Sequence, residues 1–189
     1  MTSSLCISAL ACVFLLDALP AQRGQSQKRV NELTLAGLRP GRDNLAAALK
    51  KYKAKYTNDQ GEGGSKTWED ACTGRALMLQ TNANMIVQEV TVSALGSTGG
   101  KCTNRSFDAL DMKDWISGHG LQLGDPQDRV TDLYGEPNST GPSIKGDKEL
   151  EFLYYAFDWA GSDVPQVLEV YCERDTGRVV EITLAYPSL

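Results

Sequence analysis

The chain has 189 residues and a formal net charge of -5. With 41% hydrophobic and 23% charged residues it has the composition of a globular protein, long enough for one ordinary domain or two small ones. The acidic balance and the lack of a basic stripe argue against a nucleic-acid partner, and we expect none.

Residues 1–21 have the pattern of a cleaved signal peptide. The apolar run at residues 5–16 has the length of a signal core and is too short to span a bilayer, and Ala21 is a small residue before the cleavage point. Residues 9–12 resemble a lipoprotein box, but Cys12 is followed by further apolar residues, so we do not expect a lipid anchor. The sequence therefore predicts a secreted or periplasmic protein without a membrane span, in which residues 22–32 form a polar leader.

The first half of the remaining chain has the pattern of a turn, a helix and three strands. Gly37 and Gly41 surround a proline and indicate a turn, and Asp43 or Asn44 is suited to cap a following helix. The apolar face of that helix is expected at Leu45, Ala48, Leu49 and Tyr52. Strands are expected at residues 67–72, 75–80 and 85–93.

The second half has a similar order of elements. A short helix is possible at residues 108–116. Asp125 before Pro126 indicates a helix N-cap, and Gly135 is suited to end that helix. The buried face is expected at Val130, Leu133 and Tyr134, the Ser/Gly/Pro-rich residues 138–147 are expected to form a loop, and strands are expected at 149–159, 167–172 and 178–184.

The two halves share two motifs, which indicates an internal repeat. Each half opens with a Gly-Leu-x-x-Gly turn and closes with a β-branched strand. The matching segments are residues 37–41 with 120–124, and residues 87–92 with 179–184. We therefore expect an α+β fold in which two helix-plus-three-strand repeats, residues 33–107 and 108–189, form an antiparallel sheet with the helices packed on one face.

The second copy resembles the small repeat of β-lactamase inhibitory protein and of the SmpA/OmlA-type outer-membrane lipoproteins. The resemblance rests on the Gly-Leu-x-x-Gly turn at residues 120–124, on Val130, and on Gly135-x-Pro137 before three strands. It spans most of residues 33–185 as two copies, although Tyr52 stands where the first copy should have a helix-ending glycine. The resemblance implies a protein-binding module, and it carries no inhibitory residue across because the shared positions are structural.

Three cysteines remain once the signal segment is removed. One disulfide and one free thiol are the default for an exported chain, and three pairings are open. We favour Cys72–Cys102 because both lie in or beside the first repeat, and closing a loop of about 30 residues contributes roughly 3 kcal/mol in the chain-entropy model. Cys172 lies in a strand pattern, and we interpret it as a small buried apolar residue.

The residues suited to catalysis or metal binding give no recognisable site. His119, the single histidine, lies between two glycines without a neighbouring nucleophile motif. Asp108, Asp111 and Asp114 have the spacing of a charged helix face and lack the pattern of a calcium loop. We therefore predict a protein that is not an enzyme and has no cofactor and no metal site.

The aromatic strand at residues 149–159 carries the candidate partner-binding residues Phe152, Tyr154 and Trp159. Strand alternation directs Phe152 and Tyr154 to one face and the intervening apolar residues to the other. Aromatic side chains on an uncovered sheet face are common anchors of protein interfaces, whereas the alternative is that both faces of the sheet are covered.

The sequence therefore predicts an exported, non-enzymatic module, inhibitor-like or an envelope-assembly accessory, that binds an unidentified protein partner through an aromatic sheet face. The alternative is a small periplasmic hydrolase or ligand carrier, which requires His119 or Cys172 to meet a carboxylate in a pocket.

Overall fold

The structure, a computed structural model, describes residues 30–52, 58–59, 64–70, 73–96, 115–157 and 167–186. The expected signal peptide, the favoured disulfide between Cys72 and Cys102, and Trp159 lie outside these residues. So does most of the possible helix at residues 108–116.

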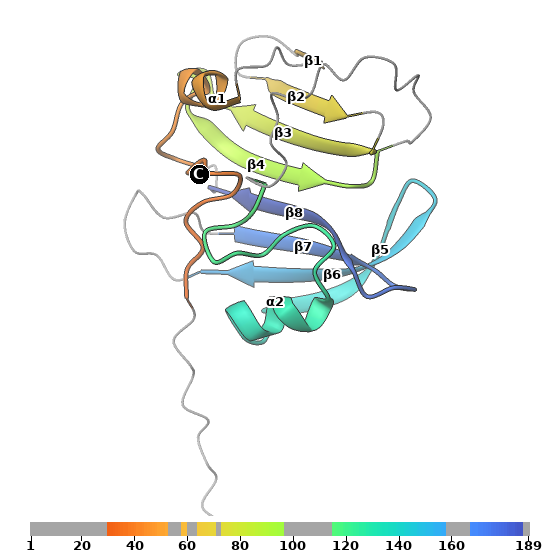
Figure 1. The fold of residues 1–189 in the computed structure, drawn as a ribbon. Coiled ribbons are helices and arrows are strands. Elements are labelled where there is room, and N and C mark those ends of the chain that lie inside the picture. Colours follow the sequence, from red (N-terminus) through yellow and green to blue (C-terminus); the bar gives the residue numbers. More distant parts are fainter. Residues whose placement is uncertain are drawn as a thin grey trace, which may run out of the picture.

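One antiparallel sheet dominates the described part of the chain (Figure 1). It has eight strands in the order β1-β2-β3-β4-β8-β7-β6-β5, so β4 and β8 join the two halves of the chain at its centre. The strands are β1 (Asn58–Asp59), β2 (Ser65–Asp70), β3 (Arg75–Thr81), β4 (Val87–Ser93), β5 (Ser139–Lys145), β6 (Lys148–Ala156), β7 (Val167–Glu173) and β8 (Val179–Ala185), and the two helices are α1 (Leu45–Tyr52) and α2 (Gln127–Tyr134).

The predicted α+β fold of two helix-plus-three-strand repeats is wrong. The described residues form a single, mostly β structure in which each helix has only eight residues. Strand β5 occupies the expected loop at residues 138–147 and pairs with β6 over its whole length, from Ser139 opposite Tyr154 to Lys145 opposite Lys148. Its Ser, Gly and Pro content hid it because an edge strand needs no apolar face and tolerates a proline.

The local signals for the two helices hold in the structure except at two residues, Leu49 and Asp125. The Asn44 side chain caps α1 by accepting a hydrogen bond from the Ala47 N–H at 3.0 Å, but the expected core residue Leu49 is exposed. Pro126, not Asp125, is the N-cap residue of α2, since the Asp125 carboxylate instead accepts from the Gln122 N–H. Gly135 ends α2 with a φ of 75°, and its N–H donates to the Thr131 carbonyl.

The glycine turns shared by the two halves each contact the start of a strand. The Gly41 N–H donates to the Val87 carbonyl at 2.7 Å, and the Gly124 N–H donates to the Val179 carbonyl at 2.8 Å. Both glycines have positive φ, 77° and 90°, which other residues adopt only with strain. The shared motif therefore reflects the same local contact between turn and strand.

A single hydrophobic core lies between one face of the sheet and the two helices. Residues paired across neighbouring strands share that face, and both α1 and α2 contribute buried side chains to it. Examples across the sheet are Trp68, Leu77, Val92, Ile182, Val170 and Leu153, each opposite the next. Ring contacts link the helices to the strands: Tyr52 with Trp68 at 5.6 Å and Tyr134 with Tyr155 at 5.7 Å between centroids. The opposite face of the sheet therefore carries the remaining, more polar side chains.

Candidate functional site

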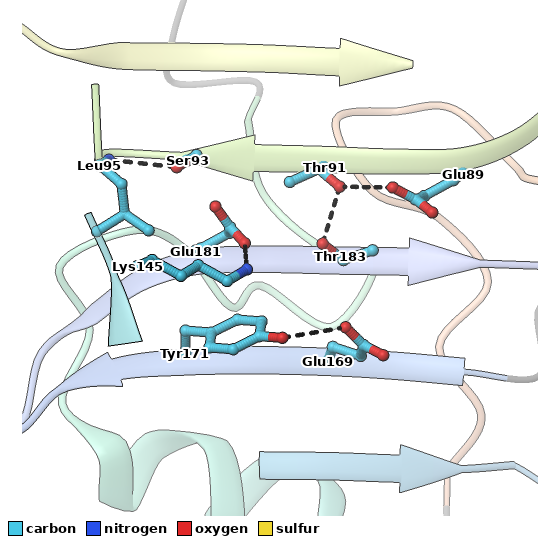
Figure 2. Close-up of polar contacts among 9 residues, drawn as sticks. All are labelled: Glu89, Thr91, Ser93, Leu95, Lys145, Glu169, Tyr171, Glu181 and Thr183. Carbon is cyan, nitrogen blue, oxygen red and sulfur yellow. Dashed lines mark hydrogen bonds and ion pairs between the residues drawn. The ribbon is translucent and has the colours of Figure 1, made fainter. Parts of the chain in front are cut away.

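The sheet face opposite the helices, which we call the polar face, gathers carboxylates, hydroxyls and aromatic rings from four central strands. Figure 2 views this face, and α2 lies behind the sheet. Two rows cross the strands side by side, as the pairing shows. One row is Ser93, Glu181, Tyr171 and Phe152, and the other is Thr91, Thr183, Glu169 and Tyr154, with Glu89 flanking Thr91 on β4.

Three aromatic side chains lie together on the polar face. Phe152 lies between the other two, with its ring centroid 4.9 Å from that of Tyr171 and 6.2 Å from that of Tyr154. All three are half-buried, whereas the alternate residues Leu153 and Tyr155 are fully buried in the core. The structure thus brings together the two candidates Phe152 and Tyr154, and adds Tyr171 from β7.

A hydroxyl contact joins β4 to β8 at the centre of the polar face. The side-chain oxygens of Thr91 and Thr183 lie 2.8 Å apart, and the Thr91 hydroxyl is also 3.3 Å from a Glu89 oxygen (Figure 2). Thr91, Thr183 and Glu181 are buried, whereas Glu89 and Glu169 are half-buried. The rings and the carboxylates of Glu89 and Glu169 are therefore among the accessible groups of this face.

Lys145, at the end of β5, reaches across the polar face. Its ammonium group lies 3.5 Å from the centroid of the Tyr171 ring and forms an ion pair with Glu181 on β8 (Figure 2). Burial lowers the pKa of Lys145, but the hydrogen bond and the charge of Glu181 outweigh it and raise the pKa above its ordinary value. Lys145 therefore stays charged and sits in a site made of one ring and one carboxylate.

The polar face disfavours the charged form of Glu89. Burial raises its pKa above the ordinary value, and the charges of Glu169 and Glu181 add to the increase, against the opposing effects of Thr91 and Lys145. The folded protein therefore binds the Glu89 proton more tightly than the unfolded chain does. The contribution of Glu89 to stability is present at low pH and is lost as the pH rises through its folded-state pKa.

We accordingly expect Glu89→Gln to raise the melting temperature near neutral pH by ~2 °C, because the glutamine has no charge to desolvate. The gain should vanish at a pH below the ordinary carboxyl range, where Glu89 is already protonated. Thermal unfolding followed by circular dichroism at both pH values checks this. A gain that persists at acidic pH, or a loss near neutral pH, would contradict the assigned cause.

A second polar cluster, with buried side chains, connects the start of the described chain to the glycine-rich turn by hydrogen bonds. The Glu32 carboxylate is fully buried and accepts hydrogen bonds from the N–H groups of Gly118 and His119, at 2.9 and 3.1 Å, and from the Tyr134 hydroxyl at 2.6 Å. It also accepts from the N–H groups of its own neighbours Leu33 and Thr34.

Tyr134 connects this cluster to the core. The hydroxyl groups of Ser117 and Tyr134 lie 2.8 Å apart, and both residues are buried. Burial, then the charge of Glu32 and the hydrogen bond to it, raise the pKa of Tyr134 well above its ordinary value, so the phenol stays protonated and donates. Because the Glu32, Ser117 and Tyr134 side chains are buried, the cluster acts as a structural connection.

The hydrolase or carrier alternative depends on His119 and Cys172, which lie in different parts of the structure. The exposed His119 ring lies 3.2 Å from the Asn31 carbonyl oxygen and packs edge-on against Tyr134. Cys172 is a free, fully buried cysteine in the core, as its strand pattern indicates, and burial raises the pKa of Cys172 to about 12. The structure does not bring these two residues together.

The described residues contain neither a candidate metal centre nor a helix that could span a membrane. Within them, no group of three or more His, Cys, Asp and Glu side chains has an arrangement that could hold a metal ion. The helices of these same residues include none with the length and apolar character needed to cross a membrane.

Comparisons with known proteins give only distant neighbours. No family model and no curated protein matches the chain. A cysteine-rich secretory protein from Staphylococcus aureus has a TM-score of 0.47 at 9% identity, with 84% of this chain and 48% of that chain covered, so this chain spans about half of its length. A DUF4309 family protein from Bacillus subtilis has a TM-score of 0.46 at 10% identity, with 83% and 88% covered. These low scores carry no functional argument, and the resemblance to the inhibitor and lipoprotein repeats stays a prediction.

Proposed function

We propose that this protein is an exported, non-enzymatic module that binds a protein partner through the polar face of its sheet. The observation that carries the proposal is the cluster of Phe152, Tyr154 and Tyr171, which is half-buried on the sheet face that neither helix covers. Aromatic side chains of this kind supply large contact areas at little cost in conformational entropy and dominate many interfaces.

The neighbouring groups fit the same role. Glu169 lies opposite Tyr154 with an accessible carboxylate, and Glu89 adds a second one on β4, farther from the rings, so the face combines apolar and polar groups as interfaces do. The signal-peptide pattern of residues 1–21 supports export. The hydrolase or carrier alternative is the weaker one, because Cys172 is buried in the core and has a raised pKa.

The partner is first captured by a photo-cross-linking amino acid placed at Tyr154 and, as the matched control, at Ile144. Ile144 is 74% exposed and lies on the neighbouring edge strand, where the pairing places it on the other side of the sheet. We expect adducts from position 154 and none from position 144. Equal adducts from both positions would contradict a specific face.

With the captured partner purified, we expect the double variant Phe152→Ala/Tyr154→Ala to weaken binding about 30-fold, which corresponds to a loss of about 2 kcal/mol. Ile144→Ala should leave the affinity unchanged. Calorimetry measures both, and circular dichroism verifies that the variants are folded. An unchanged affinity in the double variant would show that the aromatic cluster does not bind this partner.

A further inference from the structure

The Tyr171 ring and the Glu181 carboxylate together hold the ammonium group of Lys145, and we call this pair of groups the seat. The ammonium group lies over the face of the Tyr171 ring while Glu181 pairs with it from the next strand. A ring face beside a carboxylate is the arrangement that proteins use to bind lysine and arginine. Both groups come from the inner strands β7 and β8, whereas Lys145 comes from the edge strand β5.

The single positive charge of Lys145 does not balance the three carboxylates Glu89, Glu169 and Glu181 on the polar face. The charges of Glu169 and Glu181 contribute to the raised pKa of Glu89, and the charge of Lys145 opposes them. The other lysine of the same hairpin, Lys148, is already paired with Glu173 at 3.2 Å. Among the described residues this face therefore carries an excess of negative charge, and a partner that supplies positive charge gains electrostatic complementarity.

The position of Lys145 also allows its ammonium group to move away from Tyr171 and Glu181. Its side chain is 36% exposed, and it is followed directly by Gly146, which has a positive φ in the hairpin turn. A lysine side chain is long and flexible, so its ammonium group can move into water while the backbone pairing with Lys148 stays intact.

We propose that the partner inserts a lysine or arginine side chain between Tyr171 and Glu181 and displaces Lys145, which holds this seat in the free protein. This inference rests on the proposed function, because it names the chemistry by which the polar face recognises its partner. Arginine is the better occupant, since its planar fork stacks on a ring and pairs with a carboxylate at the same time.

The first test uses ethylguanidinium as the probe, with its uncharged analogue N-ethylurea as the control. Lys145→Met keeps an apolar stem and vacates the seat, and Lys148→Met removes the same charge from the same hairpin. We expect nuclear magnetic resonance titration of the Tyr171 ring to show ethylguanidinium binding at least about five-fold tighter to Lys145→Met than to the wild type. Lys148→Met should resemble the wild type, and adding Glu181→Gln to Lys145→Met should abolish the gain.

Three results would overturn the proposal: no gain in Lys145→Met, an equal gain in Lys148→Met, or equal binding of N-ethylurea. The purified partner then separates this inference from the proposed function. If Phe152→Ala/Tyr154→Ala leaves the partner's affinity unchanged, the proposed function fails. If that variant weakens binding but Lys145→Met does not strengthen it, the partner binds this face without using the seat, and only the present inference fails.

Discussion

Replacing Glu32 with alanine is expected to lower the free energy of unfolding by about 3 kcal/mol. The change removes the acceptor of the Tyr134 hydroxyl and of the N–H groups of Gly118 and His119. Tyr134 is itself 1% exposed, so its hydroxyl cannot turn to water without disturbing the core. For a chain of this size the loss corresponds to a fall in melting temperature of about 10 °C.

Two further variants make the Glu32 experiment specific. Glu32→Gln retains an acceptor and should cost less than Glu32→Ala. Asp132→Ala removes a carboxylate from the exposed side of α2 and should change stability by less than about 0.5 kcal/mol. Thermal and urea unfolding of the three variants are the measurements. If Glu32→Ala were as stable as Asp132→Ala, the buried cluster would have no structural importance.

Replacing Trp68 with alanine is expected to cost about 4 kcal/mol, because it leaves a large cavity beside Tyr52 and Leu77. Trp68 is fully buried in the core cluster that continues across β4 and β8 to Tyr155. Trp68→Phe fills part of the space and should cost clearly less.

The Trp68 variant also tests whether the sheet is one cooperative unit. Since one core crosses the whole sheet, Trp68→Ala should shift a single unfolding transition, seen alike by far-ultraviolet circular dichroism and by fluorescence of the remaining tryptophans. Two separate transitions, with only the first shifted, would indicate that the two halves fold independently.

Local signals in the sequence were sufficient for the strands with apolar alternation. In β6 the alternation correctly separated Leu153 and Tyr155, which are buried, from Phe152 and Tyr154, which lie on the polar face. Asn44 and Gly135 likewise marked helix ends that the structure confirms. The failure at β5 has a physical reason: its pairing uses backbone groups, and its side chains face mostly water.

The polar face and the buried cluster are only partly predictable from the sequence, because Lys145 and Glu32 each contact segments that are distant in the chain. Tyr171 alternates with apolar residues in β7, a signal that could have joined it to Phe152 and Tyr154. Lys145 had no such signal, since its position over Tyr171 follows from the hairpin that β5 makes with β6. The sequence places Glu32 in a polar leader, and nothing in its neighbours in sequence indicates that its carboxylate accepts hydrogen bonds from Tyr134 and from two distant backbone N–H groups.

Binding of the partner to the polar face, and not to the helix side, can be tested on the two sides of the sheet separately. Methyl resonances of Met78, Thr91 and Thr183 report the polar face, and those of Leu123 and Leu133 report the side where the helices pack. The measurement is a titration of the methyl-labelled protein with the purified partner, followed by nuclear magnetic resonance. We expect the largest shifts at Met78, Thr91 and Thr183. Largest shifts at Leu123 and Leu133 would show that the partner binds the helix side.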